Sequence, residues 1–275
     1  MYNDNTTTAL KCEFKSDLAE ATIEFLLKSR GVSGFGQYHT ANPKSENPKP
    51  YIELPWGDIL SMVKNPGSIP KEKAQWAIFS RANGPYARVH QWQRDNGQFF
   101  CAWGDIDDVS GLTMLDVINR AREALPGIQH IIYSSRSARP DLPKSRILVP
   151  FSGIVQGADY SMIQKILNDR LEAAGLPPDR ASERPGQLCY LPNRGEFYEY
   201  QIIDGPLLDP CQAFESEIIA EQARLKKEQE QRDRRHRAAI PVEAYRQNYP
   251  VELALEQYGY VRRGNKWISP IVFFT

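Results

Sequence analysis

Two aspartates separated by one residue follow a strongly apolar stretch near the middle of the chain. Asp105 and Asp107 end the run Gln98-Phe-Phe-Cys-Ala-Trp-Gly-Asp-Ile-Asp, which predicts a strand. Because alternate side chains of a strand point to opposite faces, the two carboxylates share one face and Ile106 packs on the other. Their Cα atoms then lie about 6 to 7 Å apart, a pair that can bind hard cations such as Mg²⁺ or Mn²⁺. Glycosyltransferases, nucleases and polymerases all use this pattern, and it also occurs in surface turns, so alone it selects no reaction.

A block of cations and hydroxyls comes next along the chain. Two predicted strands, which begin at His130 and Ser145, enclose a polar loop, and the block spans this loop and the start of the second strand. Cationic side chains opposite paired carboxylates suit a triphosphate, which needs guanidinium groups on one side and metal on the other. An exposed basic hairpin is the alternative interpretation. The block consists of Ser135, Arg136, Ser137, Arg139, Lys144 and Arg146.

A third block, from Pro178 to Gly195, adds one more carboxylate, Asp179, and further cations. Tyr190 lies in the short predicted strand Gln187-Leu-Cys-Tyr-Leu-Pro, where it either stacks on a nucleic-acid base or belongs to the core. The cations of this block are Arg180, Arg184 and Arg194.

In this order the three blocks resemble the archaeo-eukaryotic primase superfamily, and specifically the primase-polymerase domains at the front of phage, prophage and plasmid replication proteins. The resemblance runs from about Pro55 to Gly195. It rests on Asp-x-Asp after a strand, on Lys-x-Arg before three apolar residues and a proline, and on Leu-x-Tyr-Leu-Pro. It implies an α+β fold, with a mostly antiparallel, RRM-like sheet flanked by helices. It also implies that Asp105, Asp107 and Asp179 are the catalytic residues and the ligands of Mg²⁺ or Mn²⁺.

The activity that the resemblance implies is that of a DNA primase or DNA-directed polymerase, a metal-dependent nucleotidyltransferase that copies a template. Its substrates would be nucleoside triphosphates and single-stranded DNA, and a separately encoded replicative helicase is one expected partner. The second block would contact the phosphates. The third block would contact nucleic acid through Arg180, Arg184, Tyr190 and Arg194.

One position departs from the family pattern. A serine in the second motif is commonly followed by a histidine that contacts the phosphates, whereas here Ser137 is followed by Ala138. Either Arg136 or Arg139 replaces that histidine, or catalysis is weakened. The alternative function is therefore a non-catalytic primase-fold protein that binds DNA or initiates replication.

The elements around these blocks predict four segments. Residues 1–54 are an N-terminal extension of helices and loops, and 55–212 are the catalytic core, with helices expected over 111–125 and 159–174. Residues 213–240 are a charged helical linker, and 241–275 are a short helical segment that is either natural in length or a truncation of a longer primase-helicase. No Gly-x-x-x-x-Gly-Lys-(Ser/Thr) phosphate loop occurs in the sequence, so a helicase motor of that type is excluded.

The composition excludes other classes of protein. The 275 residues include 34 Lys and Arg and 34 Asp and Glu, so the net charge of +0 gives no global attraction to nucleic acid or to an anionic membrane. No stretch approaches the roughly 20 apolar residues of a membrane span, and the start has no signal-peptide pattern, which favours the cytoplasm and no membrane partner. The four cysteines have neither zinc nor disulfide-framework spacing, and reduced thiols are expected. The four histidines never form the His-x-His pair of rolling-circle relaxases.

Overall fold

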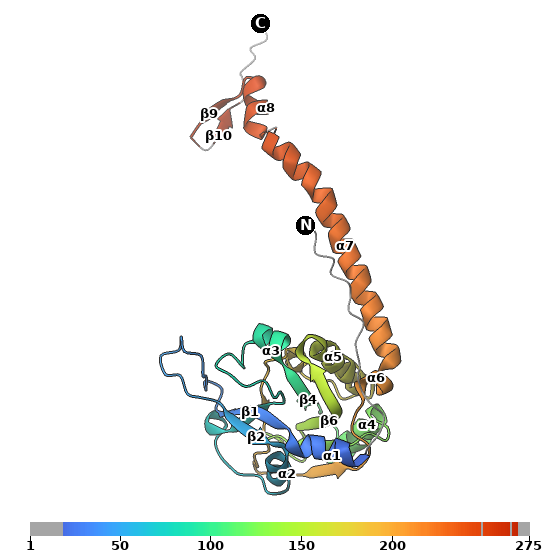
Figure 1. Cartoon of the computed structure of the whole chain (residues 1–275). Helices are drawn as coiled ribbons and strands as arrows, with labels where there is room; N and C mark the ends of the chain where they lie inside the picture. Colours follow the sequence, from blue (N-terminus) through green and yellow to red (C-terminus); the bar gives the residue numbers. More distant parts are fainter. Residues whose placement is uncertain (1–18, 249, 265, 269–275) are drawn as a thin grey trace. The chain divides into compact units, whose positions relative to one another are not determined.

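The computed structural model describes residues 19–248, 250–264 and 266–268, and it divides into two compact units at Ile218/Ile219 (Figure 1). The first unit contains helices α1 (Ala19–Lys28), α2 (Trp56–Lys64), α3 (His90–Asn96), α4 (Met114–Ala124), α5 (Gly157–Ala173) and α6 (Pro210–Ala213), and the short 3₁₀ helices η1 (Lys71–Lys73) and η2 (Arg180–Glu183). Its strands are β1 (Arg30–Phe35), β2 (Ile52–Pro55), β3 (Gln75–Ile78), β4 (Gln98–Ile106), β5 (His130–Ser134), β6 (Ser145–Gln156), β7 (Cys189–Tyr190) and β8 (Tyr200–Ile203).

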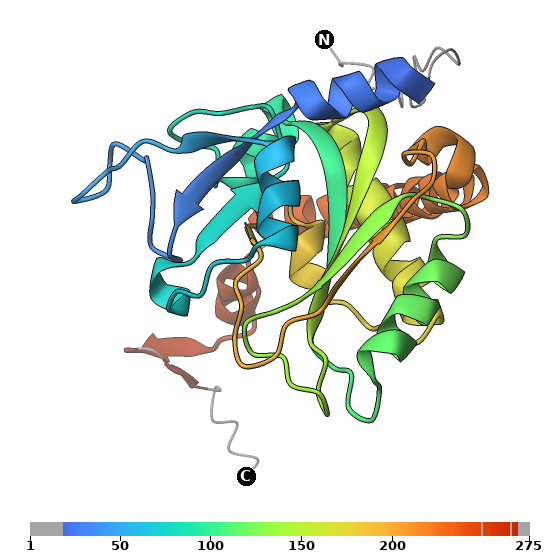
Figure 2. The same ribbon diagram turned by 90° about the horizontal axis from the view of Figure 1, so that it is seen from below.

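The strands of the first unit form two antiparallel sheets (Figure 2). One sheet has the order β2-β1-β3-β7, and the other has the order β4-β6-β5-β8. In the second sheet Asp105 of β4 lies opposite Arg146 of β6. Antiparallel sheets flanked by helices agree with the predicted α+β class, but the expected single sheet is replaced by two.

The second sheet is buried on both faces, which explains its almost continuously apolar strands. Ile132 and Ile147 join one core cluster, together with the apolar sides of α4 and α5. Ile131 and Leu148, each next to one of these residues in its strand, join a second cluster with α1, α2 and β3. The alternation of strand side chains therefore sends one set toward α4 and α5 and the other toward α1 and α2.

The outer edge of β4 is not paired by another strand, and three separate segments cover it. At its start, Phe100 N donates to Phe79 O at 3.0 Å. Further along, the side chain of Gln164 bonds both the N–H and the C=O of Trp103. At its end, Asp179 N donates to Asp105 O at 2.8 Å. Each buried main-chain group that these segments reach therefore has a partner.

The N-terminal region differs from the predicted extension of helices and loops. Within residues 1–54 the structure has α1, which the sequence indicated, but also β1 and most of β2, and β1 pairs with β3 of the core. Glycines at 31 and 34 interrupt β1 and obscured any strand pattern. This region is thus part of the first sheet.

The second unit carries the charged run and the end of the chain. Helix α7 (Glu215–Asn248) contains the predicted linker and extends past residue 240. It is followed by α8 (Val251–Gln257) and by the hairpin of β9 (Val261–Arg263) and β10 (Lys266–Ile268). Strands were not expected in residues 241–275, of which 249, 265 and 269–275 lie outside the described residues.

The cysteines follow the sequence prediction in part. Cys101 and Cys189 are buried free thiols, as expected. Cys211 takes part in a disulfide, so the prediction of reduced thiols is wrong there, because sequence spacing does not reveal a pairing between distant segments. Cys12 lies outside the described residues. Among the described helices none has both the length and the apolar character needed to cross a membrane.

His130 gives the fold a defined pH dependence. Its ring is fully buried, Nδ1 donates to Ile128 O at 2.8 Å, and burial lowers the pKa of the imidazole below its ordinary 6.5. The unfolded chain therefore binds more protons than the folded chain as the pH falls below about 6.5, and the free energy of unfolding decreases by up to about 1.4 kcal/mol per pH unit.

We predict that His130→Asn, which keeps a donor for the Ile128 carbonyl, flattens this dependence. Urea unfolding at pH 7.5 and 5.5 measures how far the free energy of unfolding of each protein changes with pH. When the changes of the wild type and the variant are compared, the contributions of groups that both proteins share cancel. Parallel losses of stability in both proteins would contradict the assignment.

Candidate active site

A cavity of about 560 Å³ lies where the ends of β4 and β6 face the segments around β3 and β7. The polar residues around it come from all three blocks of the sequence. Its lining consists of Lys71, Ala74, Asp105, Asp107, Ser135, Arg136, Ser137, Lys144, Arg146, Asp179, Gln187, Leu188, Tyr190, Leu191 and Asn193. Nine of the thirteen predicted site residues therefore share one cavity.

The innermost charged pair is formed by Asp105 and Arg146, whose side chains are 18% and 12% exposed. Arg146 Nη2 lies 3.3 Å from each Asp105 oxygen but donates a hydrogen bond to Oδ2 alone, and the buried Oδ1 accepts none from the described residues. Burial raises the pKa of Asp105, the guanidinium opposes this, and Asp107 and Asp179 reinforce it. Burial acts to lower the pKa of Arg146, but Asp105 together with Tyr133, Cys189 and Asp107 outweighs it and the pKa is raised.

A second charged pair repeats the first at the mouth of the cavity. Lys144 Nζ lies 3.3 Å from Asp107 Oδ1, and the Asp107 side chain is 57% exposed. Ile106, between the two aspartates, is fully buried in the cluster that includes α4 and α5. The two carboxylates thus share one face of β4 and Ile106 occupies the other, as the alternation predicts.

The third carboxylate reaches the site through main-chain pairing. Pro178 forms an antiparallel bridge with Ile106, and Asp179 N donates to Asp105 O. Asp179 Oδ1 accepts from Ala181 N at 2.8 Å and so caps η2. This pairing places the Asp179 side chain on the same cavity as Asp105 and Asp107.

The carboxylates fit a hard divalent cation in their chemistry. All the acidic groups that line the cavity offer oxygen, which Mg²⁺ and Mn²⁺ prefer, and Asp105 Oδ1 is a buried acceptor without a donor among the described residues. Across the described part of the chain, however, no three acidic, histidine or cysteine side chains are already gathered as ligands. Arg146 and Lys144 instead balance the charges of Asp105 and Asp107.

The loop between β5 and β6 presents the second block to the cavity. Ser135 Oγ and Ser137 Oγ lie 3.4 Å apart, and Arg136 Nη1 donates to Arg194 O at 3.0 Å. A Cβ on Gly195 would lie 2.0 Å from the Arg136 carbonyl oxygen. Only glycine therefore allows the main chain at position 195 to lie this close to the main chain of the loop.

The two arginines that were considered as replacements for the family histidine differ in position. Arg136 lines the cavity, whereas Arg139 Nε donates to Asp141 Oδ1 at 3.1 Å on the surface and does not line it. Ala138 is buried, and its main chain closes a turn onto Ser135 O. Of the two candidates, Arg136 is the one that a ligand in the cavity would meet.

Tyr190 forms an apolar and aromatic wall of the cavity. Lys71 Nζ and Arg146 Cζ lie 5.8 and 5.9 Å from its ring centroid, within reach of the ring's negative face. Its main-chain oxygen accepts from the hydroxyl of Tyr133 at 2.8 Å, and β7 pairs Tyr190 with Trp76. The main chain of Tyr190 is therefore held by both sheets.

Three arginines of the third block do not line the cavity. Arg180 bonds three carboxylates, with Nη1 2.6 Å from Asp169 and 2.9 Å from Glu183, and Nη2 on Glu172. Arg184 is exposed, and its Nε donates to Ala181 O at 3.4 Å. The main chain of Arg194 is bound by Gly67 and Arg136.

Several lining residues were not assigned from the sequence. Lys71 precedes β3 and lies outside the three blocks. Asn193 bonds both main-chain groups of Ile69, at 2.9 and 2.8 Å, and so ties the segment that leads to Lys71 against the third block. A lone lysine and a lone asparagine carry no sequence signal, because their role depends on contacts between distant segments.

No protein-family model and no curated protein matches this chain. Among solved structures it is similar to the AEP domain of the cyanophage S-2L primase-polymerase (PrimPol), with 15% sequence identity and a TM-score of 0.39. The match covers 69% of this chain and 89% of that chain. A likeness of this extent does not establish a family, and the function is argued below from the site.

The buried pair predicts a strong effect of Arg146→Met on stability. Removing the guanidinium leaves the Asp105 carboxylate poorly hydrated and without its cation, which lowers the free energy of unfolding by about 3 kcal/mol. Asp105→Asn in the same background restores part of this loss, because an amide carries no charge. Urea unfolding of the four proteins in this double-mutant cycle measures the coupling.

The matched control is Arg139→Met, which breaks an exposed pair and should change the free energy of unfolding far less than Arg146→Met does. If Arg146→Met lowers the free energy of unfolding equally in the wild-type and Asp105→Asn backgrounds, the coupling is contradicted.

Proposed function

We propose that this chain is a metal-dependent nucleotidyltransferase of the primase-polymerase type, which copies a single-stranded DNA template. One observation carries the proposal: Asp105, Asp107 and Asp179, from separate segments, line one cavity together with the cations of the second block. Its volume lies in the range of small-molecule sites. The ordered motifs that resemble archaeo-eukaryotic primases support the same reaction class.

The acidic wall would hold Mg²⁺ or Mn²⁺ through Asp105, Asp107 and Asp179. When bound, divalent cations in such a site lower the pKa of the attacking 3′-hydroxyl and neutralise charge on the phosphates. Asp105 Oδ1, buried and without a donor among the described residues, is the oxygen best prepared for this role.

The basic wall would bind the triphosphate. Arg146 and Lys144 now face the carboxylates, and in the complex they would turn toward phosphate oxygens, with Arg136 and the hydroxyls of Ser135 and Ser137 completing the contacts. Arg136 then supplies the cation that the histidine provides in the resembling family. Tyr190 offers an aromatic face for a base beside these groups.

Template binding would depend on local charge. Because the net charge of the chain is +0, contacts with DNA phosphates come from the few cations near the site, and the affinity should fall steeply with salt. A separately encoded helicase is the partner that would keep such a weak binder on its template.

A non-catalytic DNA-binding or replication-initiation factor is the second candidate, and Ala138 favours it. This residue is buried and lines no part of the cavity, so the position of the expected histidine contributes no phosphate ligand. The two candidates differ in whether nucleoside triphosphates bind at all.

We predict that Asp105→Asn and Asp107→Asn each lower the rate of primer synthesis at least about 100-fold, because each removes a metal ligand worth several kcal/mol in the transition state. The assay uses single-stranded DNA, nucleoside triphosphates and Mg²⁺ or Mn²⁺, with product separated on gels. Asp141→Asn, which removes an exposed aspartate paired with Arg139, is the matched control and retains activity.

Wild-type product no greater than that of a variant carrying both Asp105→Asn and Asp107→Asn would exclude catalysis. Calorimetry with a nucleoside triphosphate and Mn²⁺ then separates the candidates. If single-stranded DNA binds while the triphosphate does not, the non-catalytic function is supported.

A further inference from the structure

A buried relay of side chains connects β4 to the segment that carries Asp179. It begins at Gln164 of α5, whose amide pairs with the outer edge of β4 as a neighbouring strand would. Trp103 N donates to Gln164 Oε1 at 3.1 Å, and Gln164 Nε2 donates to Trp103 O at 2.7 Å. Oε1 also accepts from Tyr160 OH, and Nε2 also donates to Asn168 Oδ1. The buried amide is therefore fully satisfied, which fixes its orientation.

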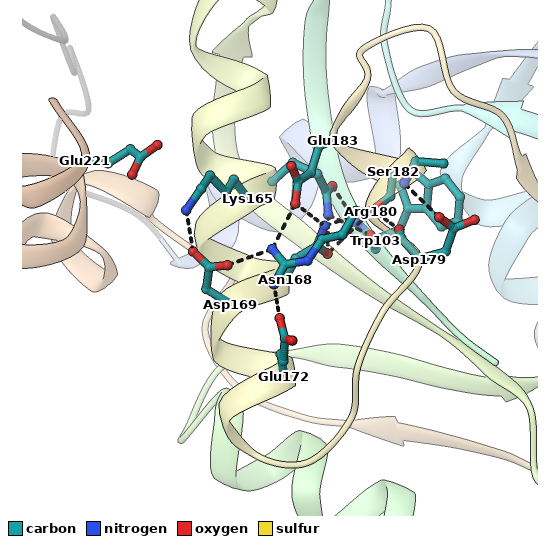
Figure 3. Close-up of polar contacts among 12 residues, drawn as sticks. Trp103, Lys165, Asn168, Asp169, Glu172, Asp179, Arg180, Ser182, Glu183 and Glu221 are labelled. Carbon is teal, nitrogen blue, oxygen red and sulfur yellow. Dashed lines mark hydrogen bonds and ion pairs between the residues drawn. The ribbon is translucent and has the colours of Figure 1, made fainter. Parts of the chain in front are cut away.

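The relay continues one helical turn further along α5. Asn168 is fully buried, and its Nδ2 donates to Ser182 Oγ at 3.0 Å and to Glu183 Oε1 at 3.2 Å (Figure 3). The hydroxyl of Ser182 in turn donates to Asp179 O at 3.0 Å. Asn168 and Ser182 thus link the interior face of α5 to the main chain of Asp179.

Asp179 completes the connection back to β4. Its N–H donates to Asp105 O, and its Oδ1 is held by Ala181 N. The relay therefore leaves β4 at Trp103 and returns to it at Asp105, on the same outward edge. On the solvent side Arg180 clamps η2 to α5 through Asp169 and Glu172 (Figure 3). Those ion pairs are partly exposed and contribute less than the buried relay.

We propose that Asn168 and Ser182 are positioning residues that hold Asp179 beside Asp105 for metal binding, an inference that rests on the proposed function. Neither residue touches the cavity, since neither is among its lining residues. Groups that orient metal ligands in this way typically change metal affinity 10- to 100-fold when they are removed.

The test compares Ser182→Ala with Ser33→Ala in the full chain. Ser33 is also fully buried, and its hydroxyl donates to Trp76 O at 2.7 Å, but it lies on β1 and does not line the cavity. Each variant loses a buried hydroxyl that donates to a main-chain oxygen and accepts from a side-chain amide, Gln75 for Ser33 and Asn168 for Ser182, so the two should lose similar stability. Calorimetric titration with Mn²⁺ alone should show affinity weakened about 10-fold for Ser182→Ala and changed less than about twofold for Ser33→Ala.

Two further variants separate positioning from loss of folding. Ser182→Thr keeps the hydroxyl and should restore Mn²⁺ affinity, whereas Asn168→Leu should weaken it like Ser182→Ala. In primer extension, Ser182→Ala should raise the Mn²⁺ concentration for half-maximal rate and lower kcat, with the KM for nucleotide within about twofold of the wild type.

Unchanged Mn²⁺ affinity in Ser182→Ala and Asn168→Leu, with an active wild type, would overturn the positioning role alone. Equal weakening in Ser33→Ala would also overturn it, because the effect would then follow stability. A wild type that neither binds Mn²⁺ nor extends a primer would overturn the proposed function and this inference together.

Discussion

The unpaired edge of β4 is the constraint on which the candidate site depends. Its outward N–H and C=O groups lie in the protein interior, where leaving them without partners is costly. Because β4 is the terminal strand of its sheet, side chains and loops must supply those partners. Asp179 reaches the site as one of these partners, so the bond that completes the edge also delivers the third carboxylate. The chemistry of the site is thus coupled to a requirement of folding.

The charges of the site follow from the register of two strands. Asp105 and Asp107 are two residues apart at the end of β4, and Lys144 and Arg146 are two residues apart at the start of β6. Asp105 lies opposite Arg146, so the antiparallel direction brings Asp107 next to Lys144. Each carboxylate consequently meets its own cation. A chain of +0 net charge can therefore contain a densely charged cavity without a large unbalanced field.

Local patterns predicted three strands of the second sheet, β4, β5 and β6, because their signals lie within single segments, whereas β8 was not predicted. The apolar run before Asp105, the alternation around Ile106 and the helices after it are all present. Of the first sheet only β7 was predicted, within Gln187-Leu-Cys-Tyr-Leu-Pro, since the other strands are short and Trp76 finds its partner Tyr190 far along the chain. The roles of Lys71 and Arg180 were missed for the same reason. Arg180 was expected to bind nucleic acid, but it lies on carboxylates of α5 that the sequence presents as ordinary helix surface.

Under the proposed function, the same charge pairs govern how ligands enter the cavity. A divalent cation alone would take Asp105 and Asp107 from Arg146 and Lys144 and leave two cations unpaired. A triphosphate alone would engage those cations and leave the carboxylates facing phosphate oxygens. If metal and triphosphate entered together, the carboxylates would face the metal and the cations would face the phosphates, so every charge would keep a partner. Under the proposed function the cross-strand pairs would therefore favour the metal–nucleotide complex over either component, and in the unliganded chain Arg146 gives the largely buried Asp105 its counter-charge.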